Sequence, residues 1–217
     1  AWVSDLQAVV DALGLKRFAL FGMSQGGAIA IAYAARHPER VSQLVFAGAY
    51  ARGSLRRGGN EVERLEAQTL VNLIRVGWAR NHSGSREVLP YRFIPRGTPE
   101  QLGWWGDLEL VTASADVAAR TLEAFQQIGV SELAERLSVP TLILHARRDA
   151  AVPFDEGRHL AALIPGARFV PLESDNHVLL ETEPAWPLFL SEVRAFLELS
   201  PLAGYGVDEL QLAGSTA

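Results

Sequence analysis

The stretch FALFGMSQGGAIAIAY, residues 18–33, passes from a short apolar run through GMSQGG into an alanine-rich run. Residues 17–21, RFALF, have the length and composition of a buried strand. The run that begins at Gly26 is apolar on every side until His37-Pro38 stops it, because proline cannot continue a helix. The stretch therefore predicts a buried strand that leads directly into a buried helix.

Three later segments repeat the strand pattern, namely VSQLVFAGAY (41–50), VPTLILHA (139–146) and ARFVPLES (167–174). Apolar runs of this kind, separated by helical stretches, are typical of strands covered on both faces. A first helix is predicted over residues 2–13, where apolar residues recur at helical spacing before Gly14. Strands that alternate with helices predict a mostly parallel α/β sheet with helices on both faces.

The middle of the chain, residues 59–130, shows no convincing strand. Apolar spacing predicts one helix around residues 62–74 and another around 117–128, and the stretch between them, which contains Trp104 and Trp105, is expected to be loop-like. We expect this insertion to form a helical cap over a site. The core is then expected to consist of residues 1–58 and 131–199, and residues 200–217 to form a tail or linker.

Composition excludes several classes of protein. With 217 residues and 48% hydrophobic content, the chain fits one domain, or one domain with an insertion, better than two independent domains. The formal charge of −5 and the short arginine-rich pieces argue against a nucleic-acid partner, and no apolar run is long enough for a membrane helix. The absence of cysteine excludes disulfides and thiolate metal sites. We expect no metal, no cofactor and no membrane partner, with the cytoplasm as the default compartment.

Residues 22–26, GMSQG, have the pattern G-x-S-x-G between the predicted strand and helix, which is the context of a nucleophile elbow. Glycines beside Ser24 let strand and helix approach closely around a strained backbone turn, and Gly27 extends that clearance. The new helix also directs its free N–H groups at the serine. The backbone N–H of Gln25 is the expected oxyanion donor.

A serine nucleophile needs a histidine base, which in turn needs an orienting carboxylate, in the chain order Ser, acid, His. His177 follows the last predicted strand, at the edge from which a side chain can reach Ser24. A structural role is the favoured interpretation of the other histidines, which are His37, His82, His145 and His159.

Asp149 is the favoured acid, because it lies just beyond the strand TLILHA. Its rivals are Asp155, expected near the start of the next helix as a cap, and Asp175, expected as a loop residue two positions before His177. Loops after three strands thus carry serine, aspartate and histidine to one edge of one sheet.

These motifs resemble the α/β-hydrolase-fold serine hydrolases with a helical cap. GMSQGG resembles the family's elbow, RRDAAVP its acid loop and SDNHVLLETEP its histidine loop, and the resemblance runs from residue 1 to about residue 199. The stretch ALGLKRFALFGMSQGGAIAIAYAARHPERV also resembles, more weakly, hydrolase-like domains joined to a nucleotide-cyclase or DNA-binding domain in bacterial regulatory proteins.

The chain departs from the family at its start. Family members carry further strands before the elbow strand, and a loop among them, often His-Gly, supplies the second oxyanion donor. This sequence has no His-Gly pair, and its strand RFALF is expected to form an open apolar edge. Such an edge tends to pair with another chain, so we expect either a fragment or a homodimer.

The resemblance implies an esterase that uses Ser24, His177 and Asp149, with Gln25 N–H at the oxyanion. Met23, Trp104, Trp105 and Phe125, together with Trp78, are candidates to line an apolar acyl pocket, and plain core packing is their alternative role. The same triad serves lactonases, C–C bond hydrolases and perhydrolases. A ligand-sensing module with little turnover and an inert fragment are further hypotheses.

Overall fold

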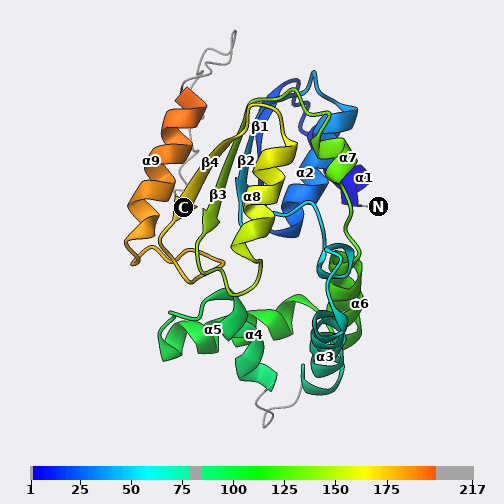
Figure 1. Ribbon diagram of the computed structural model, residues 1–217, viewed down its shortest axis with the longest axis vertical. Coiled ribbons are helices and arrows are strands. Elements are labelled where there is room, and N and C mark those ends of the chain that lie inside the picture. The colour runs from blue at the N-terminus through cyan, green and yellow to red at the C-terminus, as the bar shows by residue number, and fades with distance from the viewer. Residues whose placement is uncertain (1, 79–84, 199–217) are drawn as a thin grey trace, which may run out of the picture.

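A computed structural model describes residues 2–78 and 85–198. Its centre is a sheet of four parallel strands whose spatial order is the chain order (Figure 1). The strands are β1 (Phe18–Met23), β2 (Val41–Ala47), β3 (Thr141–Ala146) and β4 (Arg168–Leu172). The predicted parallel α/β sheet is therefore confirmed.

Helices cover both faces of this sheet, as Figure 1 shows. Alternate residues of the buried strands point to opposite faces, so that Phe46 and Ile143 belong to one apolar cluster and Val45 and Leu144 to another. The first cluster packs under the helices α1 (Trp2–Ala12), α2 (Gln25–Arg36), α7 (Ser131–Ala134) and α8 (Phe154–Leu163). The second packs under α9 (Ala185–Glu198).

The strand register brings the carboxyl ends of all four strands to one edge. Met23 pairs with Ala47, Ala47 with Leu144, and Ala146 with Leu172. Because parallel strands end side by side, the loops that follow them all leave from this edge.

β1 is an edge strand, since it pairs with β2 alone among the described residues. Phe21, in the middle of β1, is 52% exposed. The structure therefore confirms the expected open apolar edge in the part of the chain that it describes.

Beyond the strand ends lies a set of helices that we call the helical layer (Figure 1). It consists of α3 (Glu61–Gly77), α4 (Ser85–Phe93), α5 (Pro99–Thr112) and α6 (Ala115–Gln126), and the 3-10 turn η1 (Ser54–Arg56) precedes it. The helices expected around residues 62–74 and 117–128 are present as α3 and α6.

The expectation of a loop between those two helices is wrong, because α4 and α5 occupy most of this stretch. A capping box begins α5: Thr98 Oγ1 accepts from the Gln101 N–H, and the Gln101 side chain accepts from the Thr98 N–H. Pro99 follows at the start of the helix, where its missing N–H costs nothing. These start signals outweigh the glycine and proline content that suggested a loop.

The predicted tail, residues 200–217, and His82 lie outside the described residues. In the ranges 2–78 and 85–198, none of the helices combines the length and the apolar character needed to span a bilayer.

Candidate active site

Ser24 stands at the turn between β1 and α2 in a strained conformation. Its φ of 52° makes it the one residue other than glycine with a positive φ in the described chain. Its N–H donates to the Ala47 carbonyl at 3.0 Å, which extends the β1–β2 ladder by one residue. Although Ser24 is the N-cap of α2, its side chain forms no capping hydrogen bond, so the helix does not engage the hydroxyl.

Glycines around Ser24 allow the close approach of strand and helix. A Cβ on Gly22 would lie 2.8 Å from the Gly27 Cα, and a Cβ on Gly27 would lie 2.5 Å from the Ala49 Cβ. A Cβ on Gly26 would meet nothing within 4 Å. The expected steric role is thus confirmed for Gly22 and Gly27, and the packing does not require a glycine at position 26.

Asp149 and His177 form a buried pair. The side chains are each 1% exposed, and His177 Nδ1 lies 2.7 Å from Asp149 Oδ2. The other carboxylate oxygen accepts from the N–H groups of Ala151 at 2.8 Å and Val152 at 2.7 Å. Since a carboxylate can only accept, the proton of a neutral imidazole here lies on Nδ1, and Nε2 of that tautomer has a lone pair.

That Nε2 is buried and has no hydrogen-bond partner among the described residues. The structure therefore joins the predicted acid to the predicted base, and no hydrogen bond links His177 to Ser24. Hydrogen bonds between catalytic residues often form only when substrate binds. The missing hydrogen bond between His177 and Ser24 is therefore compatible with His177 as the base. Ser24, Asp149 and His177 all follow strands that end at the same sheet edge.

Gly48 is a site residue that the sequence reasoning missed. It follows β2 with a φ of 56°. A Cβ there would lie 2.8 Å from Cε1 and 2.9 Å from Nδ1 of His177, and 3.3 Å from Asp149 Oδ2. A glycine directly after a buried strand, as in FAGAY, is the signal that could have found it.

The loop that carries His177 is built from polar contacts. Asn176 donates its N–H to Ser174 Oγ at 2.9 Å and its side-chain amide to Glu183 at 3.3 Å. Glu183 also accepts from the Ser174 hydroxyl and from the Leu180 N–H. The acidic residue downstream of the histidine therefore closes this loop.

The helical layer reaches this loop through the end of α4. The Phe93 carbonyl accepts from the N–H groups of His177 at 2.9 Å and Val178 at 3.0 Å. The Phe93 ring lies 5.9 Å from the imidazole and stacks on Trp105 at 5.4 Å. Phe93 was not among the predicted site residues.

The rival acids have other partners. Asp175 binds Arg96 and Arg148, and the hydrogen bond from Arg96, followed by that from Arg148, lowers the pKa of its carboxyl group. Asp155 lies in the first turn of α8 and pairs with Arg158 at 3.3 Å. The N-cap of α8 is Pro153, so the expectation that Asp155 caps this helix is wrong by two positions.

Four of the five candidates for substrate binding lie in different surroundings, and Trp78 is the fifth. Met23 ends β1 beside Ser24, and Trp105 reaches the acid–base pair through Phe93. Trp104 is 62% exposed and contacts Trp105 edge to face. Phe125 packs on the Trp2 ring of α1, with 5.4 Å between the ring centroids.

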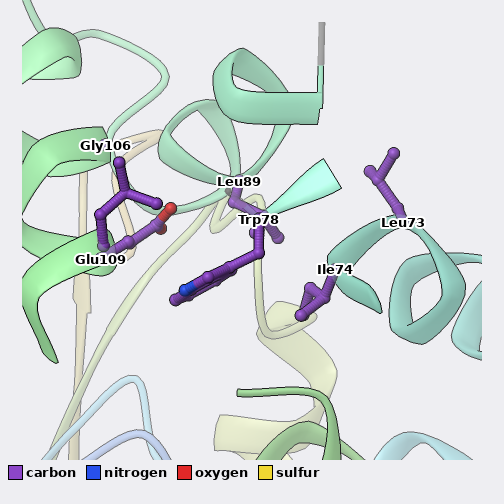
Figure 2. A pocket seen from close by; sticks show the side chains of 7 residues that line it. Leu73, Ile74, Trp78, Leu89, Gly106 and Glu109 are labelled. Carbon is purple, nitrogen blue, oxygen red and sulfur yellow. The ribbon is translucent and has the colours of Figure 1, made fainter. Parts of the chain in front are cut away.

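A small apolar pocket lies inside the helical layer (Figure 2). Burial raises the pKa of its one carboxyl group, that of Glu109, to about 7, although a hydrogen bond from Trp105 Nε1 at 2.9 Å opposes the shift. Trp78, also in the pocket, donates its indole N–H to the Ala113 carbonyl. The lining residues are Leu73, Ile74, Trp78, Leu89, Gly106, Glu109 and Leu110.

A cation also lies near the acid loop. Arg92 on α4 donates weakly to the Ala151 carbonyl, at 3.4 Å. Burial lowers the pKa of its guanidinium group, and the negative charge of Asp149 opposes that shift. Within the described ranges, no cluster of histidine and carboxylate side chains is arranged to hold a metal ion.

Comparison with known proteins assigns the sequence of this chain to a family. The sequence family described as alpha/beta hydrolase fold matches residues 2–184. The chain belongs to this family. It is 31% identical over 174 residues to the AB hydrolase superfamily protein YisY of Bacillus subtilis, a match that covers 80% of this chain and 64% of that protein.

Two further proteins are similar to most of this chain. Identity is 27% over 204 residues to a pimeloyl-[acyl-carrier protein] methyl ester esterase of Neisseria meningitidis, covering 90% of this chain and 60% of that protein. Among solved structures, the esterase EaEST from Exiguobacterium antarcticum is 25% identical with a TM-score of 0.69, covering 91% of this chain and 70% of that one. The chain thus spans about two thirds of the length of such relatives.

Proposed function

We propose that this protein is a serine hydrolase of carboxylic esters, with Ser24 as nucleophile, His177 as base and Asp149 as the orienting acid. The observation that carries the proposal is the buried hydrogen bond of 2.7 Å between His177 Nδ1 and Asp149 Oδ2. It leaves Nε2 with a lone pair and no partner among the described residues. The strained turn holds Ser24 at the same sheet edge, with a hydroxyl that does not cap its helix.

In this mechanism, Nε2 of His177 removes the proton of Ser24 as Oγ attacks the ester carbonyl. Asp149 stabilises the imidazolium that forms. Gln25 is the first residue of α2, so its backbone N–H has no acceptor within the helix, and in this mechanism it binds the oxyanion. His177 then gives its proton to the leaving alcohol. It next takes a proton from a water molecule that attacks the acyl carbon, and returns this proton to Ser24 Oγ as the carboxylic acid leaves.

An ester as substrate agrees with the similarity to esterases. We assign residues 59–130 as a cap over the core formed by residues 1–58 and 131–199. Small or apolar acyl groups fit a site next to Phe93 and Trp105, and the proposed acyl-binding residues are Met23, Trp104, Trp105 and Phe125.

Steady-state hydrolysis of a short-chain aryl ester tests the proposal. Wild type is compared with Ser24→Ala, His177→Ala and the control Ser191→Ala, which removes an exposed hydroxyl of α9. We expect both site variants to lose nearly all enzymatic turnover and the control to keep it. Turnover that survives in Ser24→Ala refutes the nucleophile. Binding of the ester without turnover in wild type favours a ligand-sensing module instead.

We also propose that the open edge of β1 pairs with a second copy of the chain. β1 has one partner strand in the described part, and Phe21 is half exposed there. Unpaired strand edges readily recruit another strand. Light scattering should give twice the monomer mass, and a stable monomer at micromolar concentration would contradict the pairing.

A further inference from the structure

A second histidine lies behind the acid–base pair. His145, on β3, has a wholly buried side chain. The Phe154 ring lies edge to face at 6.0 Å, and α8 packs on the imidazole through Gly157, where a Cβ would lie 2.3 Å from Nδ1. The ring is therefore enclosed on these sides.

The surroundings fix where its proton lies. Nε2 is 3.1 Å from the Val152 carbonyl, which can only accept, so Nε2 carries the proton. Nδ1 is buried and has no partner in the described part of the chain. A second proton on Nδ1 would be a buried donor without an acceptor, and burial correspondingly lowers the pKa of His145. The ring is a neutral donor through Nε2.

The Nε2–H of His145 lies close to both the Val152 carbonyl and the Asp149 carboxylate. Nε2 lies 3.5 Å from Asp149 Oδ2, the oxygen that accepts from His177. Val152, whose carbonyl binds His145, donates its own N–H to Asp149 Oδ1 at 2.7 Å. His145 therefore binds Val152, whose N–H binds the Asp149 carboxylate. His145 Nε2 also lies close to the carboxylate itself.

We propose that His145 is a positioning residue that keeps the Asp149 carboxylate turned toward His177 through its Nε2–H. The inference rests on the proposed roles of Asp149 and His177. His145 takes no proton in the reaction, because it is neutral and enclosed. Its effect reaches the substrate through Asp149 and then His177.

The test compares His145→Phe, which keeps an aromatic ring without the N–H, with His145→Gln, whose side-chain amide returns a donor near the position of Nε2. Tyr33→Phe is the control, because it removes another buried polar atom without a partner in the described residues. We expect His145→Phe to lower kcat about tenfold with KM unchanged, as for a lost hydrogen bond near a charge. His145→Gln should recover most of the loss, and the control should match wild type.

Equal kcat in His145→Phe and wild type, with only the urea midpoint altered, would overturn the proposal and make His145 a core residue. Failure of His145→Gln to recover the activity lost in His145→Phe would also overturn the proposal.

An NMR measurement that does not depend on turnover tests the role of His145 separately from the proposed esterase function. The Nδ1–H proton of His177, in its hydrogen bond to Asp149, is observed by NMR of protein with 15N-labelled histidine. We expect the signal to shift or broaden in His145→Phe and to return in His145→Gln. An unchanged signal overturns the positioning role even if wild type proves inactive, whereas inactivity with the expected shift refutes only the proposed function.

Discussion

The sheet edge and the helical layer hold their side chains in different ways. At the sheet edge, backbone groups fix two of the site residues: two N–H groups bind Asp149 Oδ1, and a ladder bond holds Ser24. The helical layer meets the site through Phe93 and the Trp105 ring behind it, and it exposes large apolar side chains such as Val76 and Val111. We therefore expect the edge to set kcat and the layer to set KM.

Asp149→Asn should have the largest effect. The amide keeps the shape of the carboxylate but can present N–H to His177, which favours the wrong tautomer and removes the charge that stabilises the imidazolium. We expect kcat to fall by about 10³–10⁴-fold with little change in KM. Asp155→Asn, at an exposed carboxylate in α8, is the control. A loss below tenfold would remove Asp149 from the mechanism.

Gly48→Ala should come next. The new Cβ would collide with the imidazole at 2.8 Å and displace it from Asp149. A misplacement of about 1 Å costs about a hundredfold in rate. Gly14→Ala is a matched control, because Gly14 has a φ of 64° and open space around its Cβ position. The positive φ should cost both variants about 1–2 kcal/mol of unfolding free energy, Gly48→Ala should lose more because of the collision, and only Gly48→Ala should lose activity. Equal activity in the two would show that the pair tolerates displacement.

Phe93→Ala tests the helical layer. It removes the ring that lies over His177 and under Trp105, and it keeps the carbonyl that holds the histidine loop. We expect KM for an apolar ester to rise about tenfold, equivalent to about 1.4 kcal/mol of lost apolar contact, with kcat within threefold. Trp104→Ala, at an exposed ring, should change KM less. A fall in kcat with KM unchanged would contradict the division between edge and layer.

Glu109→Gln should have the smallest effect, on stability alone. The pKa of Glu109 is raised from 4.5 to about 7 in the folded protein. Between these values the native state keeps a proton that the unfolded chain has lost, so unfolding free energy falls as pH rises through that window. Because the carboxyl is partly exposed, we expect a loss of roughly 1 kcal/mol that Glu109→Gln abolishes.

Urea unfolding at several pH values measures this slope, with the exposed Glu132→Gln as control. A wild-type slope retained in Glu109→Gln would place its origin elsewhere.

Much of the core could be predicted because local sequence encodes it. The buried strands read as apolar runs, and Asp149 and His177 each follow such a run, so parallel topology alone brings them to one edge. Their contact at 2.7 Å confirms that the two side chains meet at this edge.

The rest depended on contacts between segments far apart in the chain. Phe93 touches His177 across more than eighty positions, and no local pattern marks that pairing. Gly48 is needed because the His177 imidazole packs against its Cα. The proposed role of His145 depends on α8 and the acid loop, which enclose its ring. Helix α5 was missed for another reason. Its capping signals at Thr98 and Gln101 are local, but the glycine, proline and tryptophan content of the stretch was interpreted as a loop.

The central claim is that Ser24 is the nucleophile activated by His177. Its most direct test is to treat the protein with a fluorophosphonate, which forms a covalent adduct with an activated serine, and to map the adduct by peptide mass spectrometry. We predict one adduct, on Ser24, formed at a rate that falls sharply in His177→Ala and not in Ser191→Ala. An unlabelled protein, or an adduct on a different serine, would contradict the account.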